Sequence, residues 1–143
     1  MKVKQISVFL GNKSGRLATV TKVLGENRIN IRALSLADTT DYGVLRLIVN
    51  DPAKAMQVLK EHDFTVSETE VLAVAIADEP GGLDRVLQIL KELGVNIEYM
   101  YAFVGKTRED AVVVIRMDQI DQALELLLKS GVKLLNAEEV YAF

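Results

Sequence analysis

The sequence repeats itself once, and this internal repeat limits the possible folds more than any other feature. Gly15 and Gly81 are separated by 66 residues, and each stands just before an apolar helical pattern. The same offset relates Leu17 to Leu83, Val20 to Val86, Leu24 to Leu90, Asn30 to Asn96 and Ile31 to Ile97. Such a match is hard to obtain by chance, so we expect two copies of one structural unit. We place the two domains at residues 1–68 and 69–143.

Hydrophobic periodicity predicts the same elements in both copies, in the order β-α-β-β-α-β. In the first copy, we expect strands at 5–10, 29–37, 42–49 and from 64, with helices at 14–26 and 52–62. In the second copy, we expect helices at 80–93 and 121–129, strands at 95–103 and 111–117, and a closing strand that ends at 141–143. Residues 65–77 form one extended stretch that links the copies. The predicted fold is α+β, with two ferredoxin-like sandwiches in tandem, each an antiparallel sheet with helices on one face.

The outward face of each predicted sheet is unusually apolar. Strand parity points Val44, Arg46 and Ile48 outward in the first copy, and Ala73, Ala75 and Ala77 outward in the second. A solvated face of an antiparallel sheet is normally polar, so we expect the other copy or a second chain to cover this one. The pattern therefore predicts a homodimer or a higher homo-oligomer.

Each copy has a glycine-containing turn directly before its first helix. A helix N-terminus offers unpaired N–H groups and a partial positive charge, which suit a carboxylate, and glycine leaves the backbone open to close approach. The repeated asparagines begin the following strands, and their amides can donate to a carboxylate and accept from an ammonium group. The alternative is that Asn12, Ser14 and Asp78 only cap the helices, with Pro80 in the first turn of the second one.

These features resemble the ACT-domain family, the small amino-acid-sensing modules of metabolic enzymes. The resemblance rests on the element order and on Asn12-Lys13-Ser14-Gly15-Arg16-Leu17, Ile29-Asn30-Ile31, Asp78-Glu79-Pro80-Gly81-Gly82-Leu83 and Val95-Asn96-Ile97. It covers nearly the whole chain, once per half. Because no catalytic domain is attached, the chain is similar to the stand-alone tandem ACT proteins.

The resemblance implies that the units pair, often side by side, with an amino-acid ligand at the pair interface. The ligand would lie between the turn before the first helix of one unit and the second strand of a neighbour. Asp78 stands where an asparagine-like residue is commoner. The implied ligand-binding residues, with their neighbours, are Asn12, Lys13, Ser14, Gly15, Arg16, Leu17, Asn30, Asp78, Glu79, Pro80, Gly81, Gly82, Leu83 and Asn96.

The function implied by the resemblance is regulatory. We expect a small-molecule-binding protein that senses an amino acid at ACT–ACT interfaces and transmits this to a partner enzyme or pathway. The alternative is a regulatory subunit without a ligand, which docks on a metabolic enzyme as a protein-interaction module.

Composition argues against several other classes of function. The chain has no cysteine and a single histidine, His62, so we expect no enzyme activity, no metal site and no cofactor. Its net charge of −3 and scattered lysines and arginines argue against a nucleic-acid partner. The longest apolar run, residues 71–77, is far too short to span a membrane, and no signal peptide precedes it, so we expect a cytoplasmic location.

Two further predictions concern the aromatic side chains of the strand at 95–103 and a pair of opposite charges at equivalent positions in the two copies. Parity places Tyr99, Tyr101 and Phe103 on the core-facing side, so we expect them to pack in the core rather than to form a ligand platform. Arg32 and Glu98 occupy equivalent positions with opposite charge, and we expect both to lie near an interface between units or chains. The alternative is that both are solvated strand residues.

Overall fold

The computed structural model describes residues 1–11, 14–38, 42–104 and 110–143, and the chain forms two compact units. The N-terminal unit comprises Lys4–Thr69 together with Tyr141–Phe143. The C-terminal unit comprises Glu70–Val140 together with Met1–Val3. Each end of the chain therefore belongs to the unit formed mainly by the other half. The domain boundaries at 1–68 and 69–143 stay a prediction.

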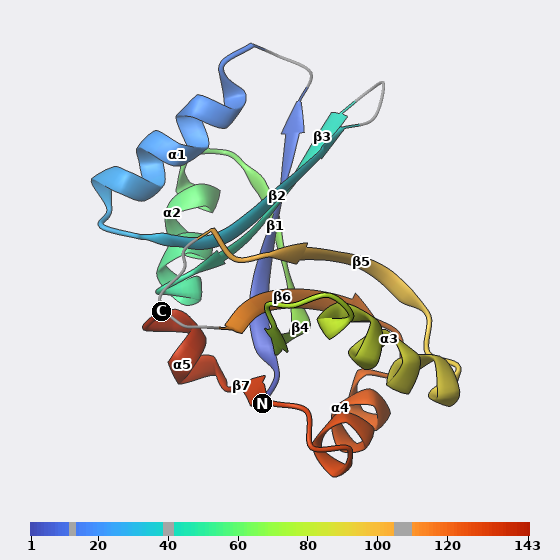
Figure 1. The fold of residues 1–143 in the computed structure, drawn as a ribbon. Coiled ribbons are helices and arrows are strands. Elements are labelled where there is room, and N and C mark those ends of the chain that lie inside the picture. Colours follow the sequence, from blue (N-terminus) through green and yellow to red (C-terminus); the bar gives the residue numbers. More distant parts are fainter. Residues whose placement is uncertain (12–13, 39–41, 105–109) are drawn as a thin grey trace. The chain divides into compact units, whose positions relative to one another are not determined.

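The N-terminal unit is a sheet with two helices on one face (Figure 1). Its strands lie in the order β2-β3-β1-β4, with β3 antiparallel to both β1 and β2. In chain order, the elements are β1 (Val3–Gly11), α1 (Arg16–Glu26), β2 (Ile31–Asp38), β3 (Tyr42–Val49), α2 (Pro52–Glu61) and the start of β4 (Thr65–Ala77).

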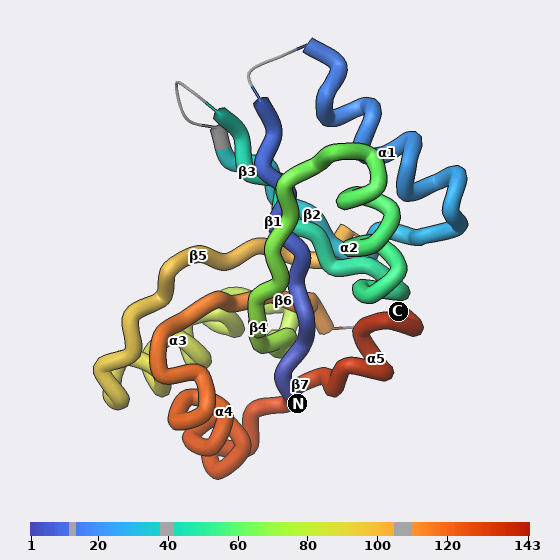
Figure 2. Tube along the Cα trace, turned by 180° about the vertical axis from the view of Figure 1, so that it is seen from behind, coloured from blue at the N-terminus to red at the C-terminus, as the bar shows by residue number. Residues whose placement is uncertain are grey.

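The core of the N-terminal unit lies between these helices and the sheet. Val20, Val23 and Leu24 recur at helical spacing on α1 and are buried against the strands. Helix α2 begins as its sequence predicts, because the Asp51 carboxylate accepts a hydrogen bond from the Lys54 N–H at 3.1 Å and Pro52 follows at once. Helices α1 and α2 lie beside each other, as the view from behind also shows (Figure 2).

The C-terminal unit repeats this arrangement with the strand order β7-β4-β6-β5. Strand β4 is antiparallel to β6 and β7, and β5 is antiparallel to β6. Helices α3 and α4 pack beside each other over one face (Figure 2). The elements after β4 are α3 (Gly82–Leu93), β5 (Ile97–Ala102), β6 (Asp110–Met117), α4 (Ile120–Lys129), β7 (Leu134–Leu135) and α5 (Ala137–Tyr141). The predicted α+β fold of two tandem ferredoxin-like sandwiches is thus confirmed.

The predicted closing strand is wrong beyond its first residues. Only Leu134–Leu135 pairs with β4, and the chain then turns into the short helix α5. Asn136 Oδ1 accepts from the Glu139 N–H at 2.8 Å, and Glu139 Oε1 accepts from the Asn136 N–H at 3.2 Å. This reciprocal pair is a capping box, which starts a helix where strand pairing would otherwise continue.

The prediction for the aromatic residues of β5 is also wrong, because the strand contains a β-bulge. The register with β6 shifts between Ile97 and Tyr99, and the extra residue reverses the parity that follows. Met100 therefore packs against the core, while Tyr99 and Tyr101 lie on the opposite face with stacked rings 6.5 Å apart. The N–H of Phe103 donates to the Val112 carbonyl at 3.0 Å, so the pairing with β6 continues to this residue.

The outward side chains of the central strands are buried at some positions and half-buried at others, such as Val44, Ala75 and Ala77. Ile48 of β3 and Val114 of β6 are both 0% exposed, and Ala73 of β4 is 1% exposed. What covers these faces, and the predicted oligomer with it, stays a prediction. None of the helices in the described part of the chain has the length and apolar character that a membrane crossing requires.

The last residues of the chain are fixed to the N-terminal unit by Tyr141. Its hydroxyl accepts a hydrogen bond from the Lys4 N–H at 3.0 Å, and its carbonyl accepts from Arg32 Nε at 3.1 Å. Tyr141→Phe should therefore lower the free energy of unfolding by about 1 kcal/mol, measured by urea denaturation. Lys133→Gln, an exposed change away from this contact, is the control.

Burial also raises the pKa of the Tyr141 phenol above its ordinary value of 10.0. The folded state then holds this proton more tightly than the unfolded state, so the associated stability is present below pH 10 and is lost as the pH rises through the raised pKa. The wild-type protein should lose stability above pH 10 more steeply than Tyr141→Phe. Parallel pH profiles would refute a role for this phenol.

Candidate functional site

The two glycine turns share one backbone conformation. Gly15 has φ 85° and ψ −4° at the N-cap of α1, and Gly81 has φ 85° and ψ −3° at the N-cap of α3. Residues that carry a Cβ atom are strained in this left-handed region, so the backbone requires glycine at the N-cap of both helices. The equivalence of the turns in the sequence is therefore also an equivalence of structure.

The helices begin two residues later than the sequence pattern predicted. Helix α1 starts at Arg16 rather than at residue 14, and α3 starts at Gly82 rather than at Pro80. Glycine holds both N-cap positions, so Ser14 and Asp78 do not occupy them. Asn12 and Lys13 lie outside the described residues. Because glycine has no side chain, the N-cap residue itself leaves the first N–H groups without the usual acceptor.

Space around the N-cap glycines is open. A Cβ atom built on either Gly15 or Gly81 would meet no heavy atom within 4 Å. Gly82 differs, because a Cβ atom there would overlap the carbonyl oxygen of Ala77 and lie 3.1 Å from Ile76 Cγ2. The turn before α3 is thus packed tightly against the end of β4 on one side and open on the other.

Hydrogen bonds hold the main chain of each repeated asparagine in place at the start of a strand. The Asn30 N–H donates to Asn50 Oδ1 at 2.9 Å, and the Asn96 N–H donates to Asp118 Oδ1 at 2.8 Å. In return, the N–H groups of Asn50 and Asp118 donate to the asparagine carbonyls at 3.1 and 3.2 Å. The side chains of Asn30 and Asn96 are exposed. Sequence reasoning missed Asn50 and Asp118, although their offset of 68 residues matches the offset after the hairpin turn.

Comparisons with known proteins decide the family. A family model described as an ACT domain pair matches residues 1–143. The chain belongs to the ACT domain pair family. Protein BT0572 from Bacteroides thetaiotaomicron is 45% identical in a solved structure, with a TM-score of 0.94 over 100% of this chain and 98% of that chain. Comparison with the curated proteins finds no match.

More distant solved structures share the fold of this ACT pair. The ligand-free regulatory subunit of aspartate kinase from Thermus thermophilus has a TM-score of 0.61 and 18% identity, over 89% of this chain and 91% of that chain. The corresponding subunit from Thermus flavus has a TM-score of 0.58 and 18% identity, over 90% and 92%. The resemblance seen in the sequence is therefore confirmed, and so is the tandem ACT fold.

Within one ACT unit, the glycine turn and the asparagine do not meet. The 11 residues of α1 lie between Gly15 and Asn30, which places the two at opposite ends of a helix about 16 Å long at 1.5 Å per residue. The same holds for Gly81 and Asn96, which flank α3. The structure therefore groups Ser14, Gly15, Arg16 and Leu17 at one end of α1, and Asp78, Glu79, Pro80, Gly81, Gly82 and Leu83 at one end of α3, each apart from the asparagine of its own unit.

The two ACT turns differ in charge. The first turn of α1 contains no acidic residue, and the Arg16 guanidinium lies 4.1 Å from the centre of the Phe64 ring. The first turn of α3 contains Asp84, and Glu79 accepts from Arg85 at 2.8 Å. An anion is therefore better matched to the N-terminus of α1 than to that of α3.

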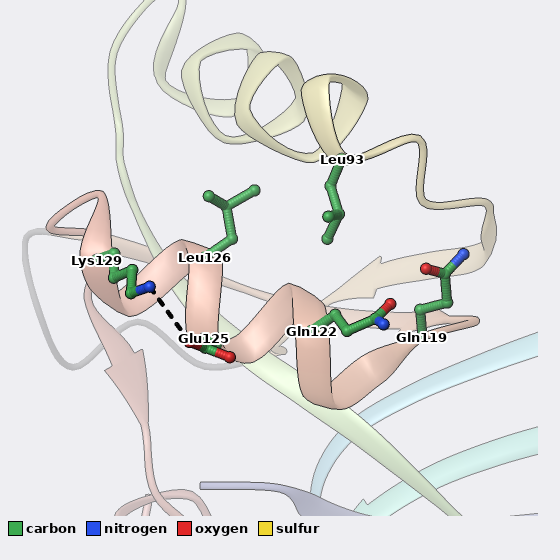
Figure 3. Close-up of a pocket in the computed structure, with 6 residues that line it drawn as sticks. All are labelled: Leu93, Gln119, Gln122, Glu125, Leu126 and Lys129. Atoms are coloured by element: carbon green, nitrogen blue, oxygen red, sulfur yellow. Dashed lines mark ion pairs between the residues drawn. The ribbon is translucent and has the colours of Figure 1, made fainter.

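Two open hollows lie in the C-terminal unit. We call the first the α3 hollow. It has a volume of about 400 Å³ and is lined by Leu87, Leu90, Lys91, Gly94, Val95, Asn96 and Ile97. We call the second the α4 hollow. It has a volume of about 380 Å³ and is lined by Leu93, Gln119, Gln122, Glu125, Leu126 and Lys129 (Figure 3). Of these two hollows, the α3 hollow is the one that includes a predicted ligand-binding residue, Asn96.

Arg32 and Glu98 each have a partner in their own unit. Arg32 donates to the Tyr141 carbonyl, and Glu98 Oε2 accepts from Arg116 Nε at 3.2 Å. The predicted position of both side chains near an interface stays a prediction. Within the described ranges, no cluster of three or more histidine, aspartate or glutamate side chains is placed to hold a metal ion.

Proposed function

We propose that this ACT pair binds an amino acid in its native state and passes the binding signal to a partner enzyme or pathway in the cytoplasm. The observation that carries the proposal is the pair of open turns, at which Gly15 and Gly81 adopt the same left-handed conformation at helix N-termini. The left-handed conformation explains why glycine stands at both positions, and the open space beside each glycine leaves room for a ligand.

The proposed ligand contacts groups from two ACT units. Its carboxylate accepts from the N–H groups at the start of α1 or α3, where the helix dipole is positive. The exposed amide of Asn30 or Asn96, from a neighbouring unit, completes the site. Within one unit, the glycine turn and the asparagine lie at opposite ends of a helix, α1 or α3, and do not meet. This separation favours a site shared between units, in a homodimer or a higher homo-oligomer.

The partner is proposed from the family and from the names of the solved structures. The Thermus structures are described as regulatory subunits of aspartate kinase. We infer by analogy that an enzyme of amino-acid metabolism is the partner of this ACT pair. In this proposal the chain itself is not an enzyme.

A docking module without a ligand is the second candidate, and exposed leucines favour it. Leu17 of α1 is 37% exposed, and Leu34 and Leu36 of β2 are 40% and 50% exposed. Exposed apolar side chains on neighbouring elements are typical of protein interaction surfaces. The two candidates differ in whether any amino acid stabilises the isolated protein.

A thermal-shift screen of the full chain against the twenty amino acids separates the candidates. A ligand that binds only the native state stabilises it by about 2.7 kcal/mol at a concentration of 100 Kd, which raises Tm measurably. We expect one chemical class of amino acid to raise Tm with a saturating dose dependence. Unchanged melting with every amino acid would favour the docking module instead.

A further inference from the structure

We propose that the ligand is an aliphatic amino acid whose side chain occupies the α3 hollow. This inference rests on the proposed function and adds the class of ligand. The proposed class of ligand is based on the apolar side chains that line the hollow. Leu90 is only 1% exposed, and Leu87, Val95 and Ile97 pack partly buried against the same core. An aliphatic ligand side chain that packs on this wall removes apolar surface from water, a gain that a polar side chain of the same size does not have.

The rim of the α3 hollow complements the charged end of an amino acid. Lys91 is exposed in the last turn of α3 and, within the part of the chain that the structure describes, makes no ion pair. The Asn96 main chain is fixed by Asp118, and its exposed side chain and Lys91 line the same hollow. The ammonium group of Lys91 attracts the ligand carboxylate that the helix N-terminus of a neighbouring unit binds in the proposed function, and the Asn96 amide can donate to that carboxylate or accept from the ligand's ammonium group.

The α4 hollow lacks this combination, although its volume is similar. Lys129 is paired with Glu125 at 3.3 Å, so a ligand carboxylate would compete with a carboxylate of the protein. Figure 3 shows this ion pair at one end of the hollow, with the amides of Gln119 and Gln122 toward the other end. Leu93 and Leu126 point into the space between, which leaves a smaller apolar wall.

The N-terminal unit repeats the asparagine of the rim, as Asn30, but not the lysine. At the 66-residue offset, Lys91 corresponds to Gly25 and Leu87 corresponds to Thr21. The cation and part of the apolar wall are therefore specific to the C-terminal unit. This difference predicts one aliphatic-ligand site per chain rather than two.

Calorimetric titration of the full chain with L-valine and L-threonine tests the proposal directly, because the two ligands have the same shape and differ by a hydroxyl group. We expect valine to bind roughly tenfold or more tightly than threonine, with one site per chain. Leucine, isoleucine and methionine should also bind. Lys91→Gln should weaken valine binding roughly tenfold by removing a charged partner, and the isosteric change Val95→Thr should weaken it as well.

Lys129→Gln is the matched control, because it removes a lysine from the last turn of the neighbouring helix without touching the α3 hollow. Valine affinity should be unchanged in this variant, and circular dichroism should show that all three variants are folded. Tighter binding of a polar amino acid than of valine would overturn the aliphatic class and leave the proposed function standing. Valine binding that is indifferent to Lys91→Gln and Val95→Thr would overturn the α3 hollow as its site. Absence of binding by all twenty amino acids would overturn the proposed function itself.

Discussion

Gly82→Ala is expected to lower the free energy of unfolding by about 3 kcal/mol, at the upper end of the usual cost of overpacking. The added Cβ atom would overlap the carbonyl oxygen of Ala77, and Ile76 Cγ2 lies 3.1 Å from the same position. A backbone oxygen at the end of β4 cannot rotate away as a flexible side chain does. The start of α3 must therefore shift, and the packing of the helix against its sheet shifts with it.

Gly25→Ala is the matched control for this prediction. Gly25 lies inside α1, and a Cβ atom there would meet no heavy atom within 4 Å. Alanine is the better helix former, so this change should raise stability by roughly 0.5–1 kcal/mol. Urea denaturation with both transition midpoint and m-value measures the two effects. Equal midpoints for Gly82→Ala and the wild type would show that α3 does not pack against β4 as closely as the structure indicates.

Gly15→Val is expected to abolish most amino-acid binding, with a loss of at least tenfold in affinity. A branched side chain would fill the open space at the N-terminus of α1, which is where the proposed ligand carboxylate approaches. The left-handed conformation also strains valine, so stability should fall by about 1–2 kcal/mol. Binding must therefore be measured at a temperature at which the variant is fully folded.

Gly131→Val separates strain from ligand contact. Gly131 has φ 77° and open space around its Cβ position, but it lies after α4 and outside both glycine turns. It should lose similar stability and keep wild-type affinity. If both variants lose affinity equally, the effect of Gly15→Val is general destabilisation, and the turn is not part of the site. Gly81→Val is expected to have a smaller effect than Gly15→Val, because Asp84 makes the start of α3 less favourable for a carboxylate.

The fold could be predicted from the sequence because its signals are local and repeated. The apolar spacing of Val20, Val23 and Leu24 marks the buried side of α1, and Val86 and Leu90 mark that of α3. The repeat presents each of these signals twice, which strengthens the assignment of the helices and strands that both copies share. Element order and fold class followed from this agreement.

Side-chain direction after the bulges could not be predicted in the same way. A β-bulge adds one residue, and its presence depends on pairing between strands rather than on a residue type. One bulge between Ile97 and Tyr99 was enough to move Tyr99 and Tyr101 to the other face, and a second shift between Ile31 and Ala33 places Leu34 opposite the core residue Leu47. Counting alternate residues from the start of a strand therefore assigns the wrong sheet face to the residues beyond a bulge.

The candidate site could be predicted in part. The glycine turns and the asparagines were found from their spacing, but the N-cap positions were assigned to residues that normally hold them, such as serine and aspartate. The structure places glycine there instead. Asn50 and Asp118 were missed because each acts on the main chain of a residue about 20 positions earlier, a contact that only the tertiary fold creates.

The proposed function depends on the binding of an amino acid by the glycine turns of the native ACT pair. Calorimetric titration of the wild type and of the Gly15→Val, Gly81→Val double variant, with the amino acid that raises Tm most, measures this dependence. We expect saturable binding by the wild type and none by the folded double variant. Undiminished affinity in the double variant, or no saturable heat with any amino acid, would contradict it.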